Sequence, residues 1–297
     1  MTLKQLEAFY WAATCASFAI AAERLHLSVS SLSKRISELE GGLGLPLFDR
    51  RSQRARLTPA GEKLLPRAQS LLQHAQTLRA DMAQPAEIEG VCRFGVGELT
   101  ALTWLPKLVA ATRKRYPQLR LEPYVDVGGE LRRRVQNGSL DFAVIAGNPT
   151  SPAIRALGAA RYTWCAAPAL VGDSSRIPPD LLHRHPLITL PREAGTTRIL
   201  DDWLTASGIA TAQHLTCNSW GAVAGLLLEG LGVGFLPVSW ATALAQRGTL
   251  RILRARPALA ALPYAFSHRD DDTRPLVDAM YGLARRTVDF GMAVRLL

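Results

Sequence analysis

The sequence has few cysteines, and none of them stands in a metal-binding or redox motif. Cys15, Cys92, Cys165 and Cys217 are far apart and form no C-x-x-C pair, so neither a structural zinc site nor a C-x-x-C redox centre is predicted. We interpret all four as small buried hydrophobic residues. A redox pair of Cys165 and Cys217 is an alternative without positive support. Because the histidines also lack neighbouring ligands at metal-binding spacing, no metal and no cofactor are expected.

Long hydrophobic runs and common catalytic motifs are missing as well. No segment approaches the ~18 consecutive apolar residues of a membrane span, and the first residues, MTLKQLEAFYWAA, do not have the form of a signal peptide. The chain also lacks G-x-S-x-G, G-x-x-x-x-G-K-[ST], H-E-x-x-H and a G-x-G-x-x-G that opens a helix. We therefore expect a soluble cytoplasmic protein that is not an enzyme and has no membrane partner.

The charge of the chain is unbalanced toward the basic side. The 297 residues carry a net charge of +10, which favours a polyanionic partner. Bulk charge does not locate the binding site, because residues 1–88 carry 11 basic against 8 acidic residues, a smaller excess than the rest of the chain. Local clustering is more specific, since four arginines without an intervening acid fall within seven residues: Arg50, Arg51, Arg54 and Arg56.

The N-terminal residues have the pattern of a helix-turn-helix. Apolar residues recur at helical spacing over residues 3–13. Ser17 can cap a second helix over residues 18–24, and Ser28 can cap a third that runs to about residue 40. Two short helices joined by so tight a turn are typical of a DNA-binding helix-turn-helix, in which the later helix enters the major groove.

The third predicted helix has two different faces. At about 100° per residue, Leu32, Ile36, Leu39 and Leu43 form one apolar stripe, which we expect to be buried. Small hydroxyls and positive charge elsewhere on the helix suit contacts with bases and phosphates of double-stranded DNA; an ordinary exposed face is the alternative. The DNA-binding residues predicted on this helix are Ser28, Val29, Ser30, Ser33, Lys34, Arg35 and Ser37.

A two-stranded wing is expected next. Gly44 and Pro46 end the helix, and the chain returns at residues 56–58 after an apolar anchor at residues 47–48. The arginines of the wing are expected to approach phosphates or the minor groove, and each phosphate contact would steepen the salt dependence of binding. These arginines are Arg50, Arg51, Arg54 and Arg56.

Residues 1–82 resemble the LysR family of bacterial transcriptional regulators. The matching strings are LKQLEAF, SFAIAAERLHLS, SLSKRISELEGGLGLPLFDR and RLTPAG, in that order. The resemblance implies a winged helix-turn-helix domain, expected over residues 1–58, and promoter DNA as its partner. Val29 departs from the glutamine that the family commonly carries near the start of the recognition helix. Valine cannot hydrogen-bond to a base, but it can contact a thymine methyl group or pack beside the buried stripe.

A linker helix and hinge are predicted over residues 59–88. Thr58 as cap and Pro59 as first helical residue begin the helix, and Pro66 should bend it. Apolar residues of this helix step by four and three, as in a heptad repeat, and form an apolar seam: Leu64, Ala68, Leu71, Ala75, Leu78 and Met82. The seam either packs on its own domain or pairs with the same helix of a second subunit. The resemblance implies the second arrangement, a homodimer, and a tetramer is implied by the resemblance alone.

From Val91 onward strands and helices alternate. A strand–helix–strand–helix–strand order over residues 91–146, with its first helix at residues 100–116, predicts a parallel sheet of an α/β fold. A second set of strands and helices follows, with a strand at residues 262–267 near its end. GVGELTALTWLPKLVAATRKRYPQL and LLLEGLGVGFLP resemble the family's effector domain, a periplasmic-binding-protein-like pair of lobes with an inducer between them. A structural nucleoid protein, an alternative, would lack such lobes. We expect the effector domain at residues 89–297, with lobe I at 89–161 and 268–297 and lobe II at 162–267.

Ligands of such folds bind at the carboxyl ends of strands and at helix N-termini. Each threonine that this rule selects could equally be a simple helix cap. Helix N-termini and a basic domain favour a small organic carboxylate as effector. Glu98 would repel such an anion unless Arg192 or Arg198 pairs with it. Alternatively, Glu98 would bind a cationic group of the effector. The predicted effector-binding residues are Glu98, Leu99, Thr100, Gly147, Asn148, Arg192, Thr196, Thr197 and Ser219.

Overall fold

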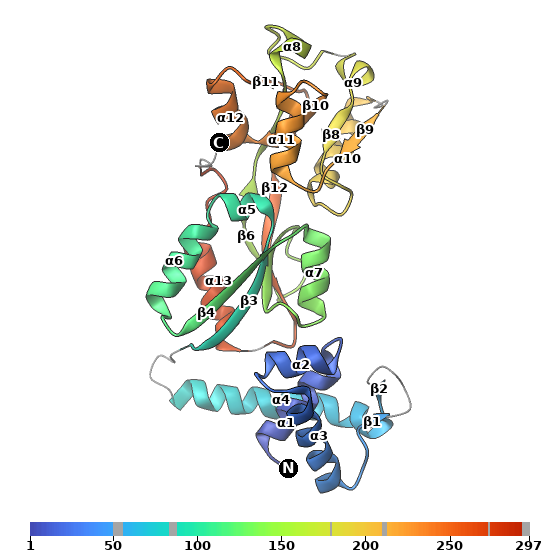
Figure 1. Ribbon diagram of the computed structural model, residues 1–297, viewed down its shortest axis with the longest axis vertical. Coiled ribbons are helices and arrows are strands. Elements are labelled where there is room, and N and C mark those ends of the chain that lie inside the picture. The colour runs from blue at the N-terminus through green and yellow to red at the C-terminus, as the bar shows by residue number, and fades with distance from the viewer. Residues whose placement is uncertain (50–55, 83–87, 179, 210–212, 273, 293–297) are drawn as a thin grey trace.

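The computed structural model describes residues 1–49, 56–82, 88–178, 180–209, 213–272 and 274–292. The helix-turn-helix unit, a first lobe and a second lobe follow one another along the longest axis of the molecule (Figure 1). The first unit contains α1 (Leu3–Thr14), α2 (Phe18–Arg24), α3 (Val29–Leu43), β1 (Phe48–Asp49), β2 (Arg56–Leu57) and α4 (Pro59–Met82).

The predicted caps of the helix-turn-helix are confirmed. The Ser17 side chain accepts a hydrogen bond from the Ile20 N–H, and the Ser28 side chain accepts one from Ser31 N–H. Each hydroxyl thereby satisfies one of the N–H groups that a helix N-terminus leaves without an intrahelical partner. Thr58 caps α4 in the same way through Gly61 N–H.

The apolar stripe of α3 is buried, with one exception. Leu32, Ile36 and Leu39 lie in the core against α1 and α2, as predicted. Leu43 was expected in the same stripe, and this expectation is wrong, because Leu43 is 37% exposed. The last turns of α3 extend beyond the neighbouring helices: a Cβ added at Gly42 would meet no atom within 4 Å.

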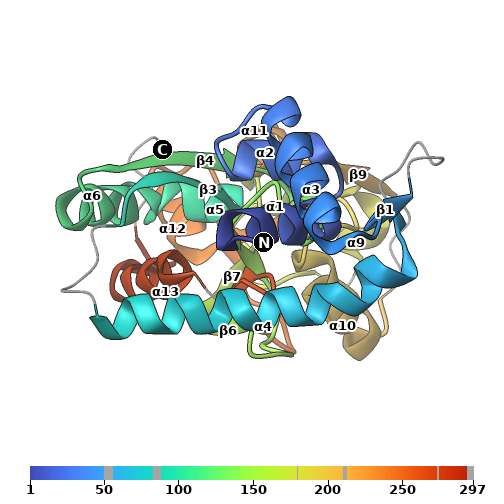
Figure 2. The ribbon, with the colours of Figure 1, turned by 90° about the horizontal axis from the view of Figure 1, so that it is seen from below.

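The linker helix α4 is one helix that crosses this end of the molecule, and Pro66 lies inside it without ending it (Figure 2). The two halves of its apolar seam have different surroundings. Ala68 is fully buried in the helix-turn-helix core, with Leu64 packed beside it. Leu71 and Leu78 are 47% and 65% exposed. The first half of the seam therefore packs on its own domain, whereas the second half presents leucines to solvent.

The first lobe is built on a mixed five-stranded sheet with the order β4-β3-β5-β12-β6. The parallel pairing of β3 with both β4 and β5 confirms the predicted strand–helix–strand–helix–strand unit. Helices α6 and α13 cover one face and α7 the other (Figure 1). The elements are β3 (Gly90–Val96), α5 (Glu98–Leu102), α6 (Leu105–Arg115), β4 (Leu119–Val125), α7 (Gly128–Gln136), β5 (Phe142–Ala146), β6 (Ile154–Ala160), β12 (Leu262–His268) and α13 (Pro275–Thr287).

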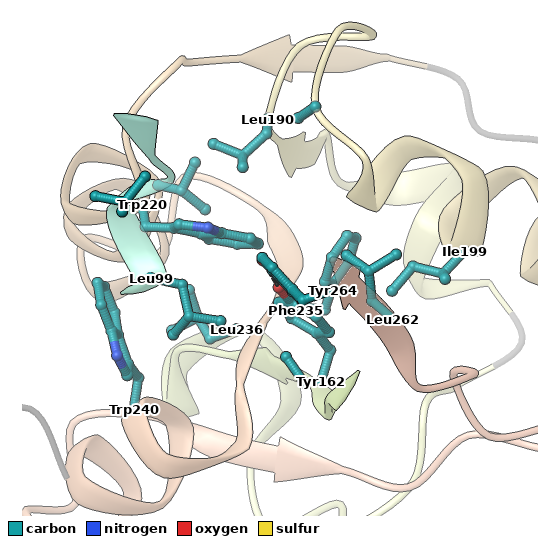
Figure 3. Packing of buried hydrophobic residues seen from close by; sticks show 14 of the residues in the cluster. Leu99, Tyr162, Leu190, Ile199, Trp220, Phe235, Leu236, Trp240, Leu262 and Tyr264 are labelled. Carbon is teal, nitrogen blue, oxygen red and sulfur yellow. Dashed lines mark hydrogen bonds between the residues drawn. The ribbon is translucent and has the colours of Figure 1, made fainter. Parts of the chain in front are cut away.

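The second lobe has its own five-stranded sheet, with the order β11-β7-β10-β8-β9. Aromatic and aliphatic side chains from both lobes meet where the chain crosses between them, and the ring of Tyr162 stacks on that of Trp220 (Figure 3). Its elements are β7 (Tyr162–Ala166), α8 (Pro168–Val171), α9 (Leu181–Arg184), β8 (Leu187–Thr189), α10 (Thr196–Ser207), β9 (His214–Thr216), α11 (Trp220–Leu228), β10 (Val233–Pro237), α12 (Val238–Gln246) and β11 (Arg251–Leu253).

The topology corrects the expected division of the lobes. Strand β12 was assigned to lobe II within residues 162–267, but it pairs antiparallel with β5 and β6 in the first sheet. Which strands pair depends on the packing of the whole sheet, and the local sequence of a strand does not specify it. The single helix expected over residues 100–116 is also two helices, because Pro106 lacks the N–H that would continue α5.

A buried cluster of charges joins the helix-turn-helix to the first lobe. The Arg24 side chain is 6% exposed, and its Nη2 lies 2.8 Å from Asp272 Oδ2 and 3.4 Å from Asp141 Oδ1. Arg274 binds the same two carboxylates, and the Arg24 guanidinium lies 4.2 Å from the centre of the Trp11 ring. Burial by itself would raise the pKa of Asp272, but attraction to Arg274 and Arg24 holds that pKa below its ordinary value.

Backbone groups complete the contact around this cluster. Arg24 Nη1 donates to the Gly138 carbonyl at 2.7 Å, and Arg269 Nη1 donates to the Thr14 carbonyl at 2.9 Å. Gly138 has a φ of +80°, and a Cβ there would lie 2.7 Å from Cys15 Sγ. The two units therefore approach each other at a position that tolerates no side chain.

Within the described ranges, no helix is both long enough and apolar enough to cross a membrane.

Replacing Arg24 with methionine should destabilise the protein, because two buried carboxylates would then share one guanidinium. Removing one partner of a buried ion pair typically costs several kcal/mol, so we expect the free energy of unfolding to fall by about 3 kcal/mol. Urea denaturation monitored by tryptophan fluorescence would measure the change. Arg113→Met, at an exposed position of α6, is the control; equal stability of the two variants would contradict this account of the cluster.

Candidate functional site

The outer face of α3 carries hydroxyls and positive charge in the open. Ser30, Lys34 and Ser37 are exposed, while Ser33 and Arg35 are half-buried. Ser28 Oγ lies 2.9 Å from the Oγ atoms of both Ser30 and Ser31, so the hydroxyls at the N-terminus of α3 form a connected group. These groups can donate to phosphates or base edges, which supports the predicted use of the helix.

Val29 belongs to this exposed face rather than to the core. It is 46% exposed at the first turn of α3, which removes one of its two predicted roles, packing beside the buried stripe. An exposed methyl-bearing side chain at a helix N-terminus can contact a thymine methyl group in a major groove.

The wing begins at a fixed position relative to α3. Glu40 Oε1 accepts hydrogen bonds from the N–H groups of Leu47, at 2.7 Å, and Phe48, at 3.2 Å. Strands β1 and β2 then pair antiparallel, which confirms the predicted two-stranded wing. Arg56 is exposed on β2. The other predicted wing arginines, Arg50, Arg51 and Arg54, lie outside the described residues.

A cavity of about 340 Å³ lies between the two lobes. Its walls come from strand ends and helix starts of both sheets, where ligands of two-lobed α/β folds bind. Glu98, Leu99, Thr196 and Ser219, all predicted as effector-binding, line it. Most of the remaining wall is apolar and includes Tyr264, a composition common in pockets for small organic ligands.

Five predicted effector-binding residues do not line this cavity. Thr100 is fully buried on the core side of α5, and Thr197 donates its hydroxyl to the Pro191 carbonyl at 3.1 Å. Asn148 and Arg192 are exposed. The Gly147 N–H donates to the Pro263 carbonyl. The rule of strand ends selected several segments that contribute to the cavity wall, but it could not tell which residues of a segment line the cavity.

Glu98 binds the second lobe rather than an arginine. Its Oε2 accepts a hydrogen bond from Trp220 N–H at 2.5 Å, and its Oε1 accepts from Gly221 N–H at 3.2 Å and Ser219 Oγ at 3.1 Å. The expected pairing with Arg192 or Arg198 is therefore replaced by pairing with the N-terminus of α11. The alternative of an unpaired Glu98 that awaits a cationic group is not supported either, because both oxygens of this carboxylate already accept hydrogen bonds from lobe II.

The Thr196 hydroxyl, in contrast to the Glu98 carboxylate, has no hydrogen-bond partner among the described residues. Thr196 lies at the start of α10 and is 3% exposed, and its Oγ1 is buried. Buried hydroxyls in native proteins are normally paired, so a buried orphan on a cavity wall indicates a missing polar partner.

Several cavity residues were not predicted. Asp126, Val127 and Gly128 line the cavity at the end of β4 and the start of α7. The strand itself was expected, and the same rule of strand ends would have selected them if it had been applied to this strand. Asn218 also lines the cavity but precedes α11 in a short loop that carries no comparable sequence signal.

The cysteines are placed as small buried or half-buried residues, and all four have free thiols. Burial raises the pKa of Cys165 to about 12, with a small opposing effect from the backbone of Leu236. A thiol of this kind forms little thiolate and reacts slowly with oxidants. Within the described part of the chain, no group of three or more His, Cys, Asp or Glu residues could hold a metal ion.

Two family models match most of the chain. Residues 3–62 match the model described as "Bacterial regulatory helix-turn-helix protein, lysR family". Residues 85–289 match the "LysR substrate binding domain". The first match contains the helix-turn-helix and wing, and the second contains both lobes and the cavity between them.

Curated proteins and solved structures agree with these matches. A "Probable RuBisCO transcriptional regulator" of Trichormus variabilis is 28% identical over 266 residues, which cover 86% of this chain and 78% of that protein. The regulator CzcR of Bacillus subtilis is 25% identical, with 84% of each chain covered. A full-length OxyR variant from Pseudomonas aeruginosa shares the fold with a TM-score of 0.68 at 22% identity, covering 98% of this chain and 96% of that one.

The exposed face of α3 leads to a prediction about salt dependence. If Lys34 contacts a phosphate, Lys34→Ala should lower affinity for DNA and reduce the slope of log affinity against log salt by about one. Fluorescence anisotropy with the intergenic DNA beside the chain's own gene would measure both. Lys114→Ala, at an exposed position of α6, should leave the slope unchanged, and an unchanged slope for Lys34→Ala would remove this residue from the interface.

Proposed function

Because the chain belongs to the LysR family of bacterial transcriptional regulators, we propose that α3 and the wing bind promoter DNA and that a small organic effector in the interlobe cavity controls this binding. The observation that carries the proposal is the combination of two sites in one chain. The face of α3 presents exposed hydroxyls and a cation, and the cavity contains the buried orphan hydroxyl of Thr196.

For the effector we propose a carboxylate with an apolar body. The N-terminus of α10 favours a negative group, and Thr196 Oγ1 is available to donate to it. Apolar side chains such as Leu99, Leu190 and Leu262 line the cavity around this position and suit a hydrocarbon body. A volume of about 340 Å³ limits the effector to a small molecule.

We propose that lobe I transmits the state of the cavity to the DNA-binding helix. Strands β3 and β5 run from the cavity wall toward the Arg24 cluster, where Asp141 immediately precedes β5. The course of β3 between these two ends can be followed in Figure 1. The cluster fixes α2, and α2 packs on α3. A change in the position of lobe I would therefore move α3 rather than leave it behind.

We further propose a homodimer in which the exposed half of the α4 seam pairs with its copy. Leu71 and Leu78 lie one heptad apart on the same side of α4, and exposed leucines in such a row are expected to be covered by a partner. A dimer would present two copies of α3 to a palindromic promoter. The proposed domain limits are 1–58, 59–88 and 89–297, with residues 262–267 belonging to the first lobe.

A mobility-shift assay tests the proposed function. The full-length protein and the intergenic DNA beside its own gene should form a complex that survives moderate salt and resists an excess of unrelated DNA. Equal retardation of unrelated DNA, or no complex in any effector state, would contradict specific promoter binding. A thermal-shift screen of small organic acids and amines would then identify effector classes, and Thr196→Val should lose the response to an acid that binds the wild type.

The proposed dimer makes a separate prediction. Glutamate at positions 71 and 78 would place four like charges in a two-fold seam, so the double variant Leu71→Glu, Leu78→Glu should become monomeric. Size-exclusion chromatography with light scattering would report the mass. Ser70→Glu, next to the seam on the exposed side of α4, should leave the oligomeric state unchanged; a double variant with wild-type mass would place the dimer interface elsewhere.

A further inference from the structure

The contact between Glu98 and α11 joins the two lobes across the cavity. Glu98 is the first residue of α5 in lobe I, whereas Ser219 and Trp220 begin α11 in lobe II. All three hydrogen bonds described above are donated by lobe II and accepted by this one carboxylate. The contact is therefore a polar link between lobes and not part of the core of either lobe.

The geometry is that of a bound carboxylate. Both oxygens of Glu98 are engaged by successive N–H groups at the N-terminus of a nine-residue helix, together with the capping hydroxyl. Anionic ligands bind helix N-termini through the same groups, because these N–H donors have no intrahelical partner and the helix dipole is positive there. Here the carboxylate belongs to the chain itself.

The ring contacts of Trp220 keep these donors in place. The Trp220 side chain is buried, stacks on Tyr162 at 5.6 Å between ring centres and meets Phe235 edge-on (Figure 3). The backbone N–H of Trp220 is thus held rigidly at the position where Glu98 accepts it. A rigid donor set favours one occupant and excludes a second anion from the same position.

We infer that Glu98 is a built-in carboxylate ligand that occupies the anion position of α11, latches the two lobes together and leaves the N-terminus of α10, with Thr196, as the position for an acidic effector. The inference rests on the proposed effector cavity, and it restricts where in that cavity an acidic group can bind. An acidic group of an effector can reach the α11 donors only if Glu98 leaves them, which requires the lobes to separate at this point.

Removing the carboxylate creates the test. In Glu98→Ala the three donors lose their acceptor, while the backbone of α11 and the hydroxyl of Ser219 are unchanged. Free acetate can then take the place of the missing side chain. We expect the melting temperature of full-length Glu98→Ala in sodium chloride to fall by on the order of 5 °C. Sodium acetate of equal ionic strength and pH should restore most of this loss in a saturable manner.

Three controls separate this inference from general effects. Wild type should show no comparable gain in acetate, because Glu98 occupies the position. Asp202→Ala, which removes an exposed acid of α10, tests the loss of one negative charge and should behave as wild type. Glu98→Gln should not be rescued, since its amide fills the space that acetate needs.

Two results would overturn the inference: no specific gain of Glu98→Ala in acetate, or an equal gain in wild type. If Glu98→Ala does not fold in chloride, the yield of folded protein after refolding in acetate against chloride gives the same comparison. Neither readout uses DNA, so failure of promoter binding and failure of the latch would be seen separately.

Discussion

The buried charge cluster around Arg24 determines how the DNA-binding unit sits on the effector domain. Arg24 comes from α2, and Asp141, Asp272 and Arg274 come from the first lobe. These four charged groups are stable only when each keeps its partners, because an unpaired charge in this environment costs several kcal/mol. The contact therefore tolerates few relative positions of the two units.

This constraint is the connection through which we propose that the two sites of the protein communicate. The interlobe cavity reaches the cluster through the strands of the first sheet, and the cluster reaches α3 through α2. At the other end of lobe I, Glu98 holds the second lobe by three hydrogen bonds. Lobe I thus makes one charged contact with lobe II, through Glu98, and one with the helix-turn-helix unit, through the Arg24 cluster. A single substitution can change either contact.

The parts of the structure that depend on local sequence were predicted well. Caps at Ser17, Ser28 and Thr58, the buried stripe of α3 and the parallel unit of the first sheet follow from spacing and from local hydrogen bonding. The resemblance of residues 1–82 and of two later segments to a known family added the two-lobed architecture.

Features that depend on distant residues were not predicted. The sequence does not show that Arg24 meets Asp272, 248 residues later, or that Glu98 meets α11 rather than an arginine. Strand β12 was predicted as a strand but placed in the wrong lobe, because its partners are chosen by the whole sheet. Strand β6 was missed, since the residues IRALGAA are rich in small side chains with little preference for strands.

The most direct test of the account is whether the state of the cavity reaches the DNA through the Arg24 cluster. The affinity of Glu98→Ala for the intergenic DNA should be measured with and without acetate, and again for Glu98→Ala combined with Arg24→Met. We predict that acetate changes the affinity of the single variant by about fivefold or more and leaves that of the double variant unchanged. An equal change in both variants would contradict coupling through this cluster.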